Sequence, residues 1–278
     1  MALTVNYMEN VLQYRANVMT FGYNKKTIVV YDDHRWILNV LNSLKNECAL
    51  NNKEWKSHNI IYFDYHDDAC NPVKFDLRKI KKFLNGNISI RDFYEIVEFE
   101  LNPYDDDWVT AGMEFELIKD VVCIGSKSEE RHIVRWKNNT YKTRLKKEHK
   151  GFCINHLKYE LTDNGAINGN NDVRNIFGYK GLNTDLTPNN PYVLDFDLDC
   201  FTEAYKKRDI AWSQKKFLEE YVNNDDTFHF MQQLIANASI ITICREPECC
   251  GGIGESNKIL GYLDRYFFDG ALRMEPTR

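Results

Sequence analysis

Five short apolar runs separated by helical patterns restrict the fold of this 278-residue sequence more than any other feature. The runs cover residues 27–31, 59–64, 121–125, 192–197 and 239–244. They are continuously apolar rather than alternating, which is typical of strands covered on both faces of a parallel sheet. Between them, apolar residues recur at helical spacing, as at Trp36, Val40 and Leu44. Strands alternating with helices predict an α/β fold, a three-layer sandwich with a mainly parallel central sheet.

Polar residues mark the ends of several predicted helices. Asp76 is expected to cap a helix that Gly86 ends. Ser89 and Asp92 form a candidate capping box for the next helix, and Ser213 is expected to open a later one.

The interval from 126 to 190 interrupts the alternation. Residues 131–136 and 142–145 flank Asn138-Asn139, which predicts a hairpin, and a loop rich in Asn and Gly follows. No internal repeat is evident. We interpret the interval as an irregular excursion from a single domain that spans residues 1–278.

Composition excludes several classes of protein. Hydrophobic residues make up 43% and charged residues 28% of the chain, which is typical of a globular protein and excludes disordered or collagen-like sequences. A formal net charge of −5 argues against a nucleic-acid partner, which needs a basic surface, and is compatible with a cationic substrate. The sequence has no apolar run long enough for a membrane span and no secretory signal pattern. We expect a cytoplasmic protein without a membrane partner.

The cysteines are scattered, and several lie inside apolar runs, so reduced thiols are expected rather than a disulfide framework. The adjacent Cys249 and Cys250 are a candidate pair for a soft metal. Because no second pair lies at zinc-site spacing, two half-buried structural residues are the favoured interpretation.

Acidic residues and histidines follow three of the predicted strands. These segments are Asp32-Asp33-His34, Asp64-Tyr65-His66-Asp67-Asp68 and Asp195-Phe196-Asp197-Leu198-Asp199. Ligands bind at the carboxyl ends of the strands in a parallel sheet. We therefore expect the three segments to converge at one site.

Alternation along an extended chain selects the candidate metal ligands within these segments. Four carboxylates brought into one cleft need compensating cations, and two divalent ions would balance them. The predicted ligands are six side chains: His34, Asp64, His66, Asp68, Asp195 and Asp197. This oxygen-rich set with two imidazoles suits manganese, while iron, zinc and magnesium stay open.

Each motif taken singly has a simpler explanation, because acidic residues after strands often cap the following helix. The presence of three such motifs at strand ends favours a metal site. A noncatalytic binding protein on a degenerate enzyme fold is a further alternative.

The motifs resemble those of the arginase and deacetylase superfamily. The arginase pattern has a histidine after the first strand, then Asp-x-His-x-Asp, then Asp-x-Asp, and a glutamate after a later strand. The corresponding residues here are Asp33-His34, Asp64 to Asp68, Asp195-Phe196-Asp197 and Glu246. With the Asp107-Trp108-Val109 segment, they are most similar to the peptide arginases, which convert arginine side chains of ribosomally made precursor peptides to ornithine. The resemblance implies an arginase/deacetylase-like fold.

The resemblance also implies two Mn²⁺ ions and a role for each ligand. By this resemblance, His34 and Asp68 would bind one ion, and His66 and Asp197 would bind the other. Asp64 and Asp195 would bridge the two ions. Two cations make water a nucleophile near neutral pH, here for attack on the guanidinium carbon.

Two catalytic residues follow from the same resemblance. Asp68 would carry a proton to the leaving amine, and Glu246 would hold the guanidinium through charge-assisted hydrogen bonds. The products would be ornithine and urea, which would make the chain a manganese-dependent peptide arginase. Its partner would be an arginine-containing precursor peptide, and a homo-oligomer stays open.

The sequence departs from enzymes that act on free arginine. Tyr31 and Asp32 replace the glycines before the first histidine, and Ala69-Cys70-Asn71-Pro72 replaces the polar segment that binds the amino acid's backbone groups. Free arginine is therefore expected to be a poor substrate. The general acid is not identified, and three histidines are candidates for it: His132, His149 and His156. For each of them an ordinary surface or packing role is the favoured interpretation.

The segment 126–150 is basic, with nine Lys or Arg and three Glu. A solvated hairpin explains this charge most simply. A second hypothesis is that the segment holds an acidic leader of the precursor peptide.

Three enzyme classes compete with the peptide arginase. A deacetylase of the same superfamily would need a tandem His-His, which the sequence lacks. A binuclear phosphoesterase would need a Gly-Asn-His element, which is also missing. A ureohydrolase acting on a small molecule remains as the third alternative.

Overall fold

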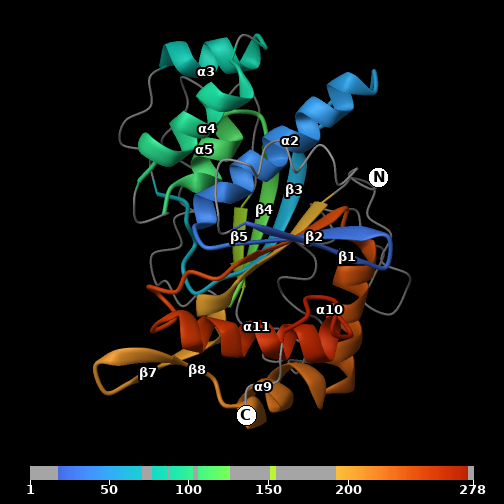
Figure 1. Cartoon of the computed structure of the whole chain (residues 1–278), viewed down its shortest axis with the longest axis vertical. Coiled ribbons are helices and arrows are strands. Elements are labelled where there is room, and N and C mark those ends of the chain that lie inside the picture. Colours follow the sequence, from blue (N-terminus) through green and yellow to red (C-terminus); the bar gives the residue numbers. More distant parts are fainter. Residues whose placement is uncertain are drawn as a thin grey trace.

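The computed structural model describes residues 18–70, 77–86, 88–102, 106–125, 151–154 and 192–274. A seven-stranded sheet lies at its centre (Figure 1). Its strands are β1 (Met19–Tyr23), β2 (Lys26–Tyr31), β3 (His58–Phe63), β4 (Ile118–Ile124), β5 (Gly151–Ile154), β6 (Tyr192–Asp197) and β9 (Ile240–Cys244). They are arranged in the order β1-β2-β9-β6-β3-β4-β5.

The sheet is parallel except at one edge. All neighbouring strands in the series β2-β9-β6-β3-β4-β5 pair in parallel. The edge strand β1 pairs antiparallel with β2. The five predicted strands are therefore confirmed, as is the α/β class. β1 and β5 do not follow from the apolar runs in the sequence.

The helices and a small hairpin complete the described fold. They are η1 (His34–Trp36), α2 (Ile37–Leu50), α3 (Leu77–Leu84), α4 (Ile90–Phe99), α5 (Trp108–Glu114), η2 (Leu198–Phe201), β7 (Thr202–Tyr205), β8 (Arg208–Ala211), α9 (Gln214–Phe217), η3 (Leu218–Val222), α10 (Asp225–Asn237) and α11 (Ile253–Phe267). The hydroxyls of Ser89 and Ser213 accept hydrogen bonds from the amides of Asp92 and Lys216, which confirms both predicted N-caps. The described residues include no helix with the length and apolar character that a membrane crossing requires.

Helices cover both faces of the sheet (Figure 1). On β2, β3, β4, β6 and β9, alternate residues enter two separate hydrophobic clusters, as strand geometry requires. Tyr31, Tyr62 and Val193 belong to the cluster under α2, α4 and α5, whereas Phe63 and Phe196 belong to the cluster under α10 and α11. The interdigitated side chains hold the strand ends in fixed register.

Several predictions lie outside the described residues. They are the cap at Asp76, the hairpin around Asn138-Asn139, the basic segment 126–150, and the candidate acids His132, His149 and His156. Of the interval 126–190, the structure describes β5 alone.

Candidate metal centre

Four neighbouring strands deliver the site at their carboxyl ends. His34 begins η1 just after β2, Asp64 follows β3, Asp197 ends β6, and Glu246 follows β9. The register pairs Asp197 with Cys244, and Cys244 of β9 also lies beside Tyr31 of β2. Because the strands are parallel and in register, side chains from distant parts of the chain meet at one edge.

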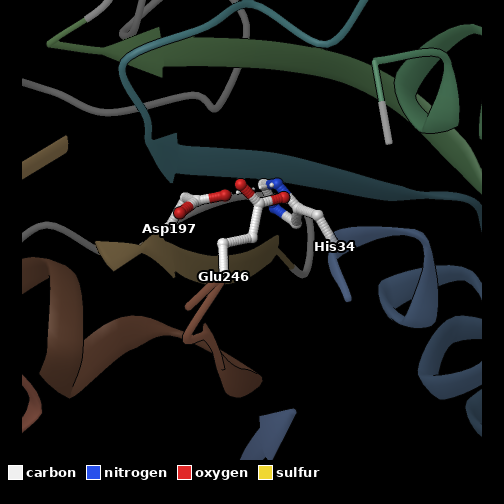
Figure 2. Close-up of side chains that lie close together, drawn as sticks. All are labelled: His34, Asp197 and Glu246. Carbon is white, nitrogen blue, oxygen red and sulfur yellow. Dashed lines mark ion pairs between the residues drawn. The ribbon is translucent and has the colours of Figure 1, made fainter. Parts of the chain in front are cut away.

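The His34 ring lies at the centre of the cluster and is fully buried. Its Nε2 is 2.7 Å from Asp195 Oδ2. Its Nδ1 is 2.9 Å from Asp197 Oδ2 and 3.0 Å from Asp68 Oδ2, but neither carboxylate has the geometry of a hydrogen bond to it. Figure 2 shows His34, Asp197 and Glu246 directed toward one another from three separate parts of the chain.

Asp64 and Asp68 approach the same ring nitrogen from the loop after β3. Asp64 Oδ2 lies 3.6 Å from His34 Nδ1 and has no hydrogen-bond partner, although it is buried. Asp68 has a left-handed backbone with φ 45°, and its Oδ2 accepts the indole N–H of Trp108 at 2.6 Å. The strained backbone turns Asp68 back toward the cluster.

His66 and Asp199 form the outer part of the site. His66 Nδ1 is 3.0 Å from Asp199 Oδ2, and its side chain is 55% exposed, so this part of the site is open to solvent. The other oxygen of Asp199 accepts the amide N–H of Tyr65. The 3₁₀ turn η2 begins after Asp197 and carries Asp199 to the side that faces His66.

Asp195 has different surroundings from the other carboxylates. Its Oδ1 accepts hydrogen bonds from the hydroxyls of Tyr31 and Thr242, and its Oδ2 accepts from His34 Nε2. It is fully buried, and both of its oxygens have protein donors. Among the described residues, Asp195 belongs to no set of three side chains whose ligand atoms lie close enough together to hold a metal ion.

Glu246 enters the site from the turn after β9. Its backbone has φ 32°, and its carbonyl accepts the amides of Cys249 and Cys250. A carboxylate oxygen of Glu246 lies within 4.8 Å of ligand atoms of His34 and Asp197. The short turn thus directs this carboxylate into the cluster.

The electrostatics of the site are those of crowded, buried acids. Desolvation raises the pKa of Asp64 and Glu246 well above the usual range, and the neighbouring aspartates raise both further. Desolvation, followed by repulsion from Asp199, raises the pKa of Asp197 to about 7. Burial alone would lower the pKa of His34, but Asp195 and Asp197 outweigh it and raise that pKa well above 6.5.

No lysine or arginine in the described ranges pairs with these carboxylates. Within the described part of the chain, bound cations or protons are what would supply the positive charge that stabilises these buried acids.

The donor set fits divalent metal ions. Three groupings have ligand atoms within 4.8 Å of one another: His34, Asp64 and Asp68; Asp64, His66 and Asp199; and His34, Asp197 and Glu246. His34 Nδ1 and Asp64 Oδ2 are buried without hydrogen-bond partners and lie 3.6 Å apart. Orphaned buried acceptors are rare in folded proteins unless an ion or a water satisfies them.

The six predicted metal ligands and Glu246 lie close together in the structure, and two further residues, Asp199 and Trp108, join them. His34, Asp64, His66, Asp68, Asp197 and Glu246 all belong to the three groupings, whereas Asp195 lies behind His34. Asp199 and Trp108 were not assigned a role from the sequence. Asp199 was visible as the third acid of Asp195-Phe196-Asp197-Leu198-Asp199, but strand alternation gave no means of choosing between the two overlapping Asp-x-Asp pairs.

The cysteines beside the site are free thiols. Cys249 is exposed, and buried Cys250 directs its Sγ to the carbonyl oxygen of Arg245 at 3.2 Å. The described groupings suited to a metal contain neither of them.

The sequence matches no protein-family model and no curated protein.

Proposed function

We propose that this chain is a dinuclear metallohydrolase with an arginase-like fold, which removes urea from arginine side chains of a peptide. The observation that carries the proposal is the pair of overlapping ligand groupings that share buried Asp64, one of which contains His34 and the other His66. A single metal ion would need only one of them.

The two ions would have the following ligands. One would be held by His34, Asp64, Asp68 and Asp197, and the other by Asp64, His66, Asp197 and Asp199. This assignment uses Asp197-Leu198-Asp199 as the Asp-x-Asp pair, two residues later than the resemblance suggested. It is supported by the short distances from Asp197 Oδ2 to His34 Nδ1 and from Asp199 Oδ2 to His66 Nδ1.

The ligand chemistry favours manganese. Carboxylates dominate the set, imidazole nitrogens complete it, and no thiolate takes part. Bound divalent ions would supply Lewis acidity that generates a nucleophile from water and would neutralise the buried acids.

The chain's own residues would position the guanidinium and move the proton. Glu246 presents a half-buried carboxylate beside the ligands, and in its ionised form this group is suited to two charge-assisted hydrogen bonds with a planar guanidinium. Asp68 has one oxygen fixed by Trp108, which leaves the other to pass a proton to the leaving nitrogen. Water adds to the guanidinium carbon, the bond from that carbon to the substrate's chain nitrogen breaks, and this nitrogen takes up the proton. The products are an ornithine side chain and urea.

The peptide preference rests on the sequence around the site. Ala69 and Cys70 replace polar residues that would bind the backbone groups of free arginine, and Ala69 is buried. The exposed side chain of His66 leaves the outer edge of the site open to a larger substrate.

The test is hydrolysis by protein reconstituted with Mn²⁺. An arginine-rich peptide, free arginine and an acetyl-lysine peptide are incubated separately, and urea, acetate and the mass of each peptide are measured. We expect urea together with loss of CH₂N₂ from the arginine peptide, and neither in the matched Asp197→Asn variant. Acetate release would select the deacetylase, and urea from free arginine alone would select a small-molecule ureohydrolase. A chain that binds no metal and releases neither product would contradict the proposal.

A further inference from the structure

We infer that Asp195 is a positioning residue that fixes the ring of His34 through its Nε2 atom. Tyr31 and Thr242 hold the Asp195 carboxylate in place and form a clamp around it. The inference rests on the proposed metal centre and assigns the first acid of the Asp195–Asp199 segment a task other than metal binding.

The hydrogen bonds of Asp195 leave it little capacity for a cation. Its Oδ2 lies 2.7 Å from His34 Nε2, and its Oδ1 accepts from Tyr31 Oη at 3.2 Å and from Thr242 Oγ1. The carboxylate is 0% exposed, so no solvent competes for these contacts. A carboxylate with donors on both oxygens holds its orientation.

The contact determines which ring nitrogen of His34 can bind a metal. An ionised carboxylate only accepts hydrogen bonds, so Nε2 carries a proton when it bonds to Asp195. A neutral ring then presents its lone pair at Nδ1, the atom that faces Asp64, Asp68 and Asp197. Carboxylates behind metal-binding histidines fix ring orientation and increase ligand basicity in this way.

Strand geometry explains why these three partners meet. Tyr31 of β2 and Thr242 of β9 lie on adjacent parallel strands, and Asp195 is the register partner of Thr242 on β6. All three side chains lie on the face of the sheet that α2 and α5 cover, below the loops that carry the ligands. The clamp therefore belongs to the rigid sheet, whereas the metal ligands lie at or beyond its edge.

The experiment is an Mn²⁺ titration of the wild-type protein, four variants at the site and one control variant, read as stoichiometry and dissociation constant. Asp195→Asn keeps an oxygen that accepts from Nε2–H, and its amide N–H groups can donate to the hydroxyl oxygens of Tyr31 and Thr242. It should still bind two ions, with affinity weakened roughly 10–100-fold. Tyr31→Phe and Thr242→Val should weaken binding in the same direction without loss of stoichiometry. Asp197→Asn, which removes a ligand, should lower the stoichiometry.

A second readout separates positioning from ligation. With Co²⁺ in place of Mn²⁺, the visible absorption band should keep its position in Asp195→Asn and shift in Asp197→Asn, because only the latter changes the ligand set. Tyr192→Phe is the matched control for the hydroxyl variants, since it removes a buried tyrosine hydrogen bond, to Leu234 O, on the opposite face. Its metal affinity should equal that of the wild type.

The outcomes distinguish the inference from the proposed function. If Asp195→Asn loses an ion and shifts the Co²⁺ band as Asp197→Asn does, Asp195 is a ligand and the inference is wrong, while the metal centre stands. Unchanged affinity in Asp195→Asn and Tyr31→Phe would also overturn the inference. If the wild type binds no metal, the proposed function fails, and the clamp has no metal ligand to position.

Discussion

Trp108 donates its indole N–H to Asp68 Oδ2 across 2.6 Å, from the first residue of α5 to the loop after β3. The same loop is tied to α5 again, because the amide of Val109 donates to the Asp68 carbonyl. The Trp108 ring also lies 4.6 Å from the ring of His34. One buried tryptophan thus orients both a proposed metal ligand and the group expected to move the proton.

Trp108→Phe removes that donor and keeps most of the apolar packing. We expect Mn²⁺ affinity or turnover on the arginine peptide to fall roughly 10–100-fold, as is typical when a hydrogen bond to a metal ligand is lost. Urea release and Mn²⁺ titration measure the two effects.

The control for Trp108→Phe is Trp212→Phe. The indole of Trp212 donates to the carbonyl of Thr202 in the cluster on the opposite face of the sheet. This variant should lose stability but keep the Mn²⁺ affinity of the wild type. Equal effects of the two substitutions on Mn²⁺ affinity would show that Trp108 acts through the fold alone.

Asp199→Asn tests which Asp-x-Asp pair holds the metal. Asp199 belongs to the grouping with Asp64 and His66 and to neither of the groupings that contain His34. The variant should therefore retain one Mn²⁺ ion and lose the other, measured as metal per chain after dialysis. Asp209→Asn, at an exposed position of β8, is the control and should retain both. Two retained ions in Asp199→Asn would restore the pair Asp195 and Asp197 as ligands.

The sequence was sufficient for five of the seven strands of the sheet and for the meeting of the acidic segments that follow them. Continuous apolar runs identified five buried parallel strands, and the acids after them had to meet because parallel strands end at one edge. Alternation placed Asp195 and Asp197 on one face correctly but could not show that the chain turns at Leu198. A 3₁₀ turn brings Asp199 into the site and leaves Asp195 beneath it.

The elements that were not predicted depend on weaker local signals. The turn between β1 and β2 places Asn24 and Lys25 at φ 47° and 64°, a conformation that favours Asn or Gly, and Lys25 is neither. The role of Trp108 depends on a contact with Asp68, forty residues away in sequence, which no local pattern reports.

His58 makes stability depend on pH at the opposite end of β3 from the site. Burial lowers the pKa of His58 to about 4, and its ring stacks on Trp55 at 4.9 Å. The folded state therefore binds fewer protons than the unfolded chain, whose histidine pKa is about 6.5. This contribution is complete above pH ~6.5 and declines as the pH falls toward 4, by up to about 3 kcal/mol.

Urea unfolding of wild type and His58→Gln between pH 7 and pH 4 measures this contribution. The wild type should lose more free energy of unfolding than the variant over that range, because glutamine does not titrate. His229→Gln, at an exposed position of α10, is the control and should follow the wild-type curve. Parallel curves for wild type and His58→Gln would show that His58 makes no such contribution.

Glu246→Gln separates substrate binding from metal binding. Glu246 lies close enough to His34 and Asp197 to be a ligand, yet the two proposed ions have four ligands each without it. If Glu246 holds the guanidinium, the neutral amide loses a charge-assisted hydrogen bond worth ~1.5–3 kcal/mol, which lowers kcat/KM roughly 10–100-fold. Mn²⁺ stoichiometry should stay at two, and Glu248→Gln, at an exposed position two residues later, should leave both quantities unchanged.

The two measurements on Glu246→Gln distinguish its alternative roles. Loss of an ion together with turnover would make Glu246 a metal ligand and leave the guanidinium without an assigned partner. Full turnover with two ions would remove Glu246 from both tasks. Retained ions with reduced turnover are expected only if the Glu246 carboxylate contacts the substrate. The strained turn after β9 places this carboxylate beside the metal ligands, although neither proposed ion needs it as a ligand.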